Sequence, residues 1–277
     1  MSNPLISVII PARNSALTIK TALDSITMQT YNNLEIIIVD DNSTDNTREV
    51  TLELMKQDPR IHYYALPEDD PYRIDPLLKR NVNAGYAARN FGFTKVHGEL
   101  VTFQDADDAS LLNRIEVQYN LLTKHKATHL CTTVAPFEER RLGTTLDMTA
   151  YASAEEHATS PQELCGLSQQ TKGLIAKVSP TLNAFIPFHF KRLRIINKLF
   201  FGSLAPYPGA GNSPLFKREV IEKVQFRKLS GRIWPSFMGR GADRDFNFQV
   251  AETFKNSYTF DIPLYMWSRE IPKQLPK

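Results

Sequence analysis

The chain has 277 residues, with 33 Lys and Arg against 30 Asp and Glu, so its formal net charge is +3. With 42% hydrophobic and 23% charged residues, the composition excludes a disordered or collagen-like chain and supplies enough apolar side chains for a core. Two cysteines, Cys131 and Cys165, are too few for a disulfide framework or a thiolate zinc site, which fits a reducing compartment. The basic residues do not cluster in the N-terminal half, so nucleic acid is not an expected partner.

Short β-branched runs alternate with helical patterns through the first half of the chain, which is typical of a mostly parallel sheet covered by helices. The expected strands are residues 5–10, 34–39, 61–66, 100–104 and 129–134. Helices are expected to begin near Ser15 or Thr18, at residues 44–46, at Ala84 and near Ser110. The predicted fold class is therefore α/β.

Two stretches interrupt this alternation. Residues 67–83 are polar and contain Pro71 and Pro76, which predicts a long surface loop. Residues 136–201 show no succession of strand and helix patterns, so the regular sheet is expected to end before them.

Two stretches of the sequence bear on contact with a membrane. The first apolar run, residues 5–10, is too short for a signal peptide or a membrane span, so we expect a cytoplasmic protein. Residues 185–201 interleave basic side chains with aromatic and aliphatic ones. This stretch either lies on an anionic membrane surface, at its inner face, or forms a buried helix whose Lys and Arg stems cover apolar neighbours.

An acidic cluster follows the strand at residues 100–104. Asp105, Asp107 and Asp108 place three carboxylates within four residues, and these repel one another unless a cation neutralises them. Hard divalent ions such as Mg²⁺ and Mn²⁺ take carboxylate and phosphate oxygens, which predicts a metal that bridges to a diphosphate. The alternative is an acidic helix start stabilised by the helix dipole.

Two further polar loops follow buried strands and are expected beside this cluster, because open α/β sheets bind ligands at the carboxyl ends of their strands. With two later motifs, the segments in chain order are Val8-Ile9-Ile10-Pro11-Ala12-Arg13-Asn14, Val39-Asp40-Asp41-Asn42-Ser43-Thr44-Asp45, Ala87-Ala88-Arg89-Asn90-Phe91-Gly92 and Asp105-Ala106-Asp107-Asp108. Together they resemble the motifs of family 2 glycosyltransferases, which implies the GT-A fold.

The resemblance assigns roles to residues of these segments. It places at the nucleotide Pro11, Ala12, Asn14, Asp41, Arg89 and Asp105, with the first four beside a uridine, Arg89 at the diphosphate and Asp105 at the ribose. It makes Asp107, together with Asp105, a ligand of Mn²⁺ or Mg²⁺. A planar guanidinium matches phosphate oxygens, and a metal stabilises a departing nucleoside diphosphate, so the residue types suit these roles.

The resemblance continues into the second half of the chain. Residues 209–218 are similar to the acceptor-side loop and following strand of the family, and residues 241–245 are similar to its glycine-glutamate-aspartate signature. Asp243 is then the general base for the acceptor hydroxyl, although Asp245 competes for this role and Ala242 replaces the usual glutamate. Three side chains just before the signature either stack on a sugar ring or belong to the core, namely Trp234, Phe237 and Met238.

The resemblance implies a metal-dependent, inverting glycosyltransferase of the hexosyl or N-acetylhexosaminyl type. It would move a sugar from a nucleotide sugar, first of all a UDP-sugar, to a glycan or lipid-linked glycan, as in surface polysaccharide synthesis. Residues 1–130 would bind the donor and residues 131–277 the acceptor, within one domain. Two alternatives stay open. One is a nucleotidyltransferase, although its glycine-rich basic loop after the first strand is missing, and the other is a non-catalytic glycan- or nucleotide-binding protein with a degraded site.

Overall fold

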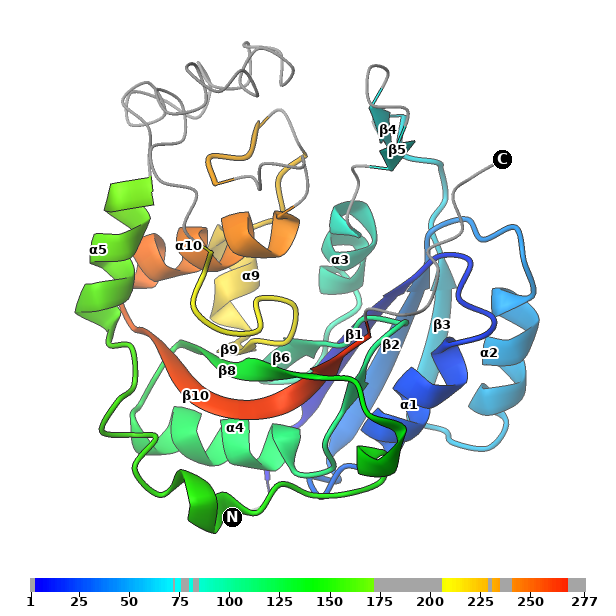
Figure 1. Cartoon of the computed structure of the whole chain (residues 1–277). Coiled ribbons are helices and arrows are strands. Elements are labelled where there is room, and N and C mark those ends of the chain that lie inside the picture. Colours follow the sequence, from blue (N-terminus) through cyan, green and yellow to red (C-terminus); the bar gives the residue numbers. More distant parts are fainter. Residues whose placement is uncertain are drawn as a thin grey trace.

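A sheet of eight strands runs through the molecule in the order β3-β2-β1-β6-β9-β8-β10-β7 (Figure 1). The computed structural model describes residues 3–71, 73–75, 80–81, 85–171, 206–228, 231–234 and 241–268. Its strands are β1 (Ile6–Ala12), β2 (Leu34–Asp40), β3 (Ile61–Ala65), β6 (Leu100–Phe103), β7 (Ala109–Ser110), β8 (His129–Pro136), β9 (Leu215–Lys217) and β10 (Ser257–Trp267). The neighbours β3, β2, β1 and β6 pair in parallel, as do β8 and β10, which confirms the predicted mostly parallel sheet.

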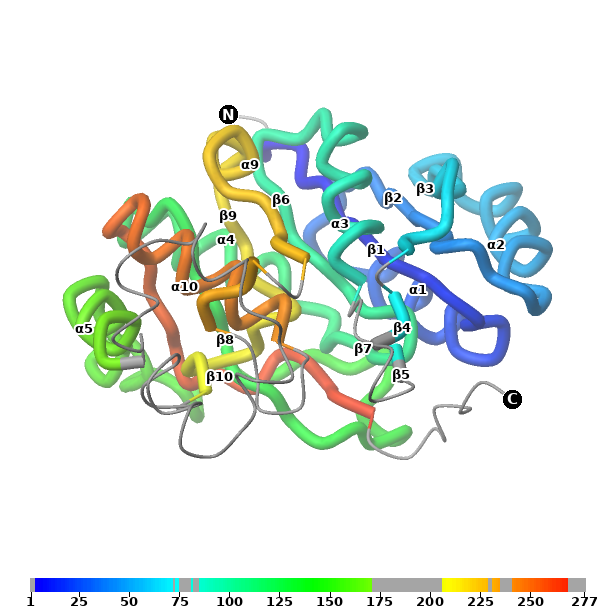
Figure 2. Tube along the Cα trace, turned by 90° about the horizontal axis from the view of Figure 1, so that it is seen from above, coloured from blue at the N-terminus to red at the C-terminus, as the bar shows by residue number. Residues whose placement is uncertain are grey.

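Helices cover both faces of the sheet, which explains why its central strands are continuous apolar runs. Val8 and Ile10 of β1 pack in one core cluster with α1 (Ile19–Thr27) and α4 (Arg114–Lys124). Ile9, between them, packs in a second cluster with α3 (Tyr86–Phe93), α9 (Glu219–Lys223) and α10 (Ala242–Phe254). Seen from above, α3 and α10 lie over the same face of the sheet (Figure 2). The helix α2 (Thr47–Met55) packs beside α1.

The structure corrects several element predictions. The loop predicted at residues 67–83 contains a small antiparallel pair, β4 (Ile74–Asp75) and β5 (Arg80–Asn81). The stretch without alternation contains two short 3-10 helices, Glu139–Arg141 and Met148–Tyr151, and the helix α5 (Pro161–Thr171).

The boundaries of the fourth predicted helix also change. Ser110 does not start α4; it belongs to β7, where it pairs with Tyr265 of β10. The partner is far away in the sequence, so no local pattern revealed this strand. The helix α3 begins at Tyr86, two residues after the predicted start at Ala84.

Two predictions on the membrane and the acceptor fall outside the described residues. They concern residues 185–201 and the side chains of Phe237 and Met238. Among the helices that the structure describes, none combines the length and apolar character needed to cross a bilayer.

Candidate functional site

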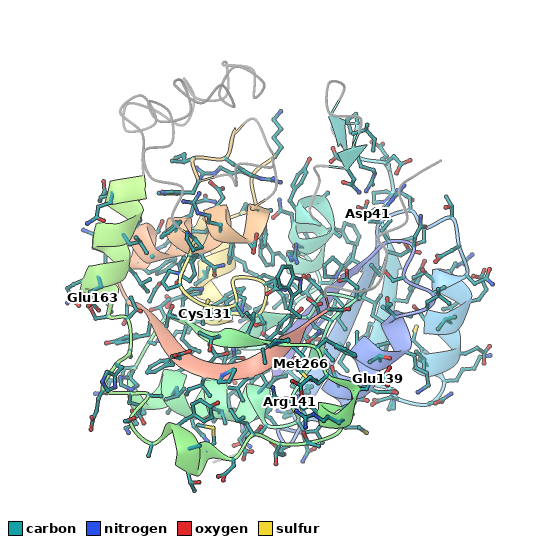
Figure 3. All side chains as sticks on the ribbon, in the orientation of Figure 1. Asp41, Cys131, Glu139, Arg141, Glu163 and Met266 are labelled. Atoms are coloured by element: carbon teal, nitrogen blue, oxygen red, sulfur yellow. The ribbon has the colours of Figure 1, made fainter. Side chains whose placement is uncertain are left out.

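The carboxyl ends of β1, β2 and β6 lie next to one another at one edge of the sheet. Ala12 at the end of β1 pairs with Asp40 at the end of β2, and β6 pairs with the other side of β1. Ala12 is buried and Pro11 is partly buried, so the backbone of β1 leads directly into the first polar loop. Asp41 begins the second loop at this edge (Figure 3). The three loops therefore meet where the sequence motifs predicted.

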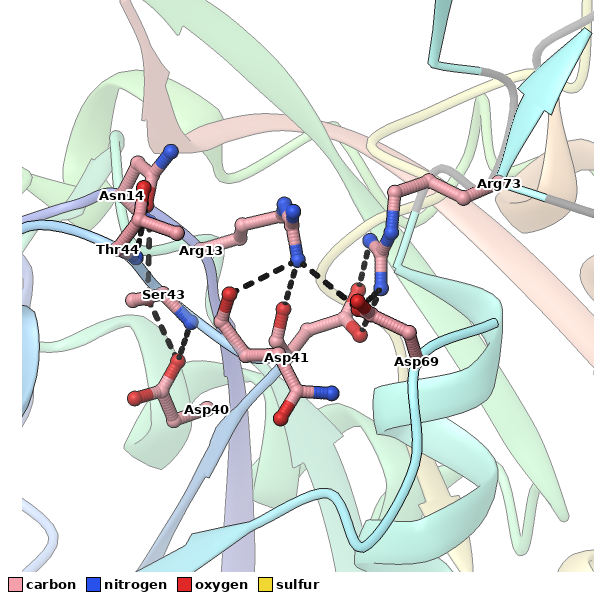
Figure 4. A network of polar contacts seen from close by, with 9 residues as sticks. Arg13, Asn14, Asp40, Asp41, Ser43, Thr44, Asp69 and Arg73 are labelled. Carbon is pink, nitrogen blue, oxygen red and sulfur yellow. Dashed lines mark hydrogen bonds and ion pairs between the residues drawn. The ribbon is translucent and has the colours of Figure 1, made fainter. Parts of the chain in front are cut away.

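The loops after β1 and β2 are hydrogen-bonded to each other (Figure 4). Asn14 has a left-handed φ of 50°, and its Oδ1 accepts the Thr44 N–H at 2.8 Å. The Asn14 N–H donates to Ser43 Oγ at 2.9 Å, and the Ser43 hydroxyl donates to Asp40 Oδ1 at 2.6 Å. Asn14 thus joins the two loops, and its contact with a nucleotide stays a prediction.

An ion pair between Arg73 and Asp41, which no sequence motif indicated, lies beside these loops. Arg73 donates from Nη1 to Asp41 Oδ2 at 2.6 Å and from Nη2 to Asp41 Oδ1 at 2.5 Å, with side chains only 7% and 5% exposed. Asp69 lies 3.3 Å from Arg73 and 3.6 Å from Arg13, whose guanidinium donates to the Asp41 and Asn42 carbonyls. The segment after β3 is therefore tied across the predicted nucleotide loops.

Arg89 of α3 points to the same edge and is 4% exposed. Its Nη2 donates to Asp105 Oδ1, and its guanidinium carbon lies 5.5 Å and 5.4 Å from the ring centres of Phe103 and Phe226. Gly85, with φ of 69°, precedes the helix, and a Cβ there would lie 2.9 Å from Arg89 Nη1. The glycine leaves room for the guanidinium, which the structure places beside the acidic cluster.

The acidic cluster holds carboxylate oxygens of Asp105, Asp107 and Asp108 within 4.8 Å of one another. Asp108 is buried, and its carboxylate accepts the Tyr265 hydroxyl and the Ser268 N–H, each at 2.8 Å. Burial is the main reason why the pKa of Asp108 is raised to about 8, and the negative charges of Asp105 and Asp107 contribute to the same shift. The sequence showed Asp108 in the cluster, but no motif indicated that Tyr265 of the last strand and Ser268 directly after it bind this carboxylate.

This donor set fits a hard divalent cation. Three converging carboxylates are the ligand type of Mg²⁺ and Mn²⁺, and a cation would favour the ionised form of Asp108, which burial and the neighbouring carboxylates disfavour. The alternative of an acidic helix start is wrong, because α4 begins only at Arg114 and its first turn carries Glu116 instead.

Two aspartates at the start of α10 have different surroundings. Asp245 is fully buried and accepts Arg227 at 2.8 and 2.7 Å, the Ile233 N–H at 2.7 Å and the Trp234 N–H at 3.0 Å. Protein donors therefore occupy this carboxylate, whereas Asp243 in the first turn is partly exposed. Of the two candidate bases, Asp243 is the one that solvent or a substrate can reach.

Trp234 belongs to the core and does not face a sugar site. It is 1% exposed, its indole N–H donates to the Ser168 carbonyl at 3.1 Å, and its ring packs 5.5 Å from that of Phe248. The core interpretation of this side chain is therefore confirmed.

The loop at residues 209–213 lies between the acidic cluster and α10. Asn212 Nδ2 donates to Asp105 Oδ2 at 2.9 Å. A Cβ on the preceding Gly211 would lie only 3.2 Å from Asp243 Oδ2. The predicted metal ligands and the predicted base thus flank two consecutive residues of one loop.

The family model described as Glycosyl transferase family 2 matches residues 7–173. An uncharacterized glycosyltransferase of Haemophilus influenzae is 32% identical over 126 residues, which cover 45% of this chain and 45% of that protein. Escherichia coli WfgD, named a UDP-Glc:alpha-D-GlcNAc-diphosphoundecaprenol beta-1,3-glucosyltransferase, is 29% identical over 130 residues, 47% of this chain and 46% of that protein. The chain thus matches less than half the length of either relative.

Solved structures resemble the whole chain at lower identity. S. aureus TarS 1-349 in complex with UDP-GlcNAc has a TM-score of 0.57 and 15% identity, covering 98% of this chain and 60% of that one. The mannosyltransferase PcManGT of Pyrobaculum calidifontis, in complex with GDP-Man and Mn²⁺, has a TM-score of 0.56 and 18% identity, covering 99% and 59%. At such identity the likeness concerns the fold, and it confirms the predicted GT-A type.

Proposed function

The chain belongs to glycosyl transferase family 2, and we propose that it is a metal-dependent, inverting glycosyltransferase. In this proposal a hexose or N-acetylhexosamine moves from a UDP-sugar to a hydroxyl of a glycan or lipid-linked glycan, as in surface polysaccharide synthesis. The observation that carries the proposal is the loop at residues 209–213, with a carboxylate cluster on one side and the partly exposed Asp243 on the other.

The ion pair of Asp41 and Arg73 supports a uracil base in the donor. Each carboxylate oxygen keeps a lone pair that Arg73 does not use, and these can accept the N3–H of uracil. The remaining guanidinium N–H groups can donate to a ring carbonyl. Pro11, Ala12 and Asn14 are proposed to line the same nucleoside.

The diphosphate is proposed to lie between Arg89 and the acidic cluster. Asp105 and Asp107, with Asp108 behind them, would hold Mn²⁺ or Mg²⁺. When bound, this ion supplies positive charge that stabilises the departing diphosphate. Arg89, which pairs with Asp105, is proposed to donate to phosphate oxygens in bidentate fashion, as its planar guanidinium allows.

Asp243 is proposed as the general base. Its carboxylate takes the proton of the acceptor hydroxyl while that oxygen bonds to the anomeric carbon, and the bond from this carbon to the diphosphate oxygen breaks with its electron pair leaving on UDP. Attack from the face opposite the diphosphate inverts the configuration. One base is sufficient for such a single displacement, which agrees with the protein contacts that occupy Asp245.

We also propose that residues 1–130 bind the donor and residues 131–277 bind the acceptor. This division is supported by β9 of the second half, which pairs with both β6 and β8, so that the two halves share one sheet. Contact of residues 185–201 with a membrane that carries a lipid-linked acceptor is also proposed. Co-sedimentation with anionic liposomes at low salt tests it, and absence of binding would remove it.

The first test is a thermal-shift measurement with UDP, GDP, CDP and dTDP, each with and without Mn²⁺, because a ligand that binds only the native state raises its Tm. We expect the largest Mn²⁺-dependent shift with UDP. The shift should disappear in Asp107→Asn and persist in Asp261→Asn, which changes an exposed carboxylate on β10. Absence of any shift in the wild-type protein would contradict the assignment of the acidic cluster.

A second measurement separates the alternatives. UDP release from UDP-glucose and UDP-N-acetylglucosamine, with a lipid-diphosphate N-acetylglucosamine acceptor, reports transfer. Nucleotide binding without turnover of any donor would favour the non-catalytic alternative. Release of pyrophosphate from a nucleoside triphosphate and a sugar phosphate would instead indicate a nucleotidyltransferase.

A further inference from the structure

A buried amide lies directly beneath the proposed base. Asn247 is on α10, one turn after Asp243, and is completely buried. Its Nδ2 donates to the Asp243 carbonyl at 2.7 Å and to the Gly211 carbonyl at 2.8 Å. One side chain therefore joins the helix turn that carries Asp243 to the loop that precedes Asn212.

The orientation of this amide is determined by its neighbours. Both Nδ2 hydrogens are used by backbone carbonyls, so Oδ1 must accept a hydrogen bond. His129 of β8 lies 2.7 Å from Oδ1 through its Nε2, which therefore carries the ring proton. His129 Nδ1 has no hydrogen-bond partner in the described part of the chain, and burial lowers the pKa of His129 to about 4, so the ring is neutral near pH 7. A neutral imidazole on the sheet thus fixes the amide.

The loop at residues 209–213 packs directly against the proposed base. A Cβ on Gly211 would lie 3.0 Å from Asn247 Nδ2 and 3.2 Å from Asp243 Oδ2, so the loop backbone packs directly on both side chains. The next residue, Asn212, donates to Asp105 Oδ2. A displacement of this loop would therefore change the distance between the acidic cluster and Asp243.

We infer that Asn247 is a positioning residue that sets the Asp243 carboxylate against the loop at residues 209–213, with His129 holding the amide in the required orientation. The inference depends on the proposed role of Asp243. It predicts an effect on the chemical step and not on donor binding. Among the described residues, the hydrogen-bond partners of the Asn247 side chain are His129, Cys131, Gly211 and Asp243, and none of these belongs to the nucleotide loops or to the predicted metal ligands.

Two variants remove the contacts in different ways. Asn247→Leu removes the hydrogen bonds to His129, Gly211 and Asp243, and a weaker one from the Cys131 thiol, at similar volume. Asn247→Asp keeps an acceptor for His129 but cannot donate to Gly211 and Asp243, so it serves if the leucine variant does not fold. The control is Gln29→Met, because Gln29 is also a buried amide that donates to two carbonyls and accepts one N–H, and these three partners lie outside α10 and the loop at residues 209–213.

The measurements are the Tm, the Kd of UDP in the presence of Mn²⁺, and kcat and donor KM for UDP release from the active UDP-sugar. We expect both kinds of variant to lower Tm. Only the Asn247 variants should lower kcat, by about tenfold or more, because small displacements of reacting groups cost one to two orders of magnitude in rate. Their Kd for UDP and their donor KM should remain within about twofold of the wild type.

The outcomes distinguish the positioning role of Asn247 from the proposed glycosyltransferase function. An active wild type with unchanged kcat in folded Asn247 variants would overturn the positioning role and leave the proposed function intact. Equal losses of kcat in Asn247→Leu and Gln29→Met would show a general effect of lost stability and also overturn it. A wild type that binds UDP but transfers no sugar would refute the proposed function, and this inference with it.

Discussion

The ion pair between Arg73 and Asp41 gives the sharpest stability prediction. Its side chains are 7% and 5% exposed, so Arg73→Met leaves a carboxylate buried without its cation. Removing one partner of a buried pair costs about 3–5 kcal/mol. A chain of 277 residues unfolds with an entropy of about 0.6 kcal/mol/K near Tm, so even the lower value should reduce Tm by about 5 °C. The affinity for UDP should fall as well, because Asp41 would lose its fixed orientation.

Urea denaturation and calorimetric titration with UDP and Mn²⁺ measure these two effects. Arg60→Met is the control, since Arg60 also forms a double hydrogen bond with an aspartate, Asp58, but with 29% and 19% exposure. We expect it to cost below about 1 kcal/mol and to leave UDP binding unchanged. The double variant Asp41→Leu/Arg73→Met should recover most of the stability but not the affinity. Equal stability losses in Arg73→Met and Arg60→Met would refute the reasoning.

Three further predictions concern the aspartates of α10, the loop at residues 209–213 and the buried His129. Asp243→Asn should lower kcat by about 10²-fold or more at unchanged Tm, whereas Asp245→Asn should mainly destabilise the fold; a reversed pattern would exchange their roles. Gly211→Ala should lower kcat about tenfold, whereas Gly166→Ala, where a Cβ meets nothing within 4 Å, should leave the rate unchanged. His129 has its pKa lowered from 6.5 to about 4, so the unfolded chain binds a proton that the folded chain does not, and stability is lost as pH falls from 6.5 to 4. This loss, about 3 kcal/mol, should be absent from the pH dependence of unfolding in His129→Gln.

The donor side of the fold was predictable from the sequence because its signals are local. Each parallel strand is a continuous apolar run, and each polar motif directly follows one of them. Strand ends meet at one edge in any parallel sheet, so the meeting of the three loops follows without knowledge of side-chain contacts. The helix α5 could have been predicted as well. Ser160 and Glu163 form a capping box around Pro161, a pattern that marks a helix start.

Other parts of the site depend on partners that no local pattern shows. Arg73 lies in a segment without periodicity, and its position follows only from the need of the buried Asp41 for a cation. Tyr265 belongs to a strand whose two partners, β7 and β8, are more than a hundred residues earlier. Its hydroxyl bonds Asp108, which the sequence presents only as a third carboxylate. The contact of Tyr265 with Asp108 forms only when β10 pairs with β7 and β8 in the folded sheet.

The position of the loop at residues 209–213 follows from the direction of one strand. β9 is antiparallel to β6, with Thr102 opposite Leu215 and Leu100 opposite Lys217. The chain must therefore enter β9 at the end of the sheet where β6 leaves, so the residues before Leu215 lie beside the residues after Phe103. This places Asn212 against Asp105 although more than a hundred residues separate them. A parallel strand in the same place would bring the loop to the opposite edge, and Asn212 could not then reach Asp105.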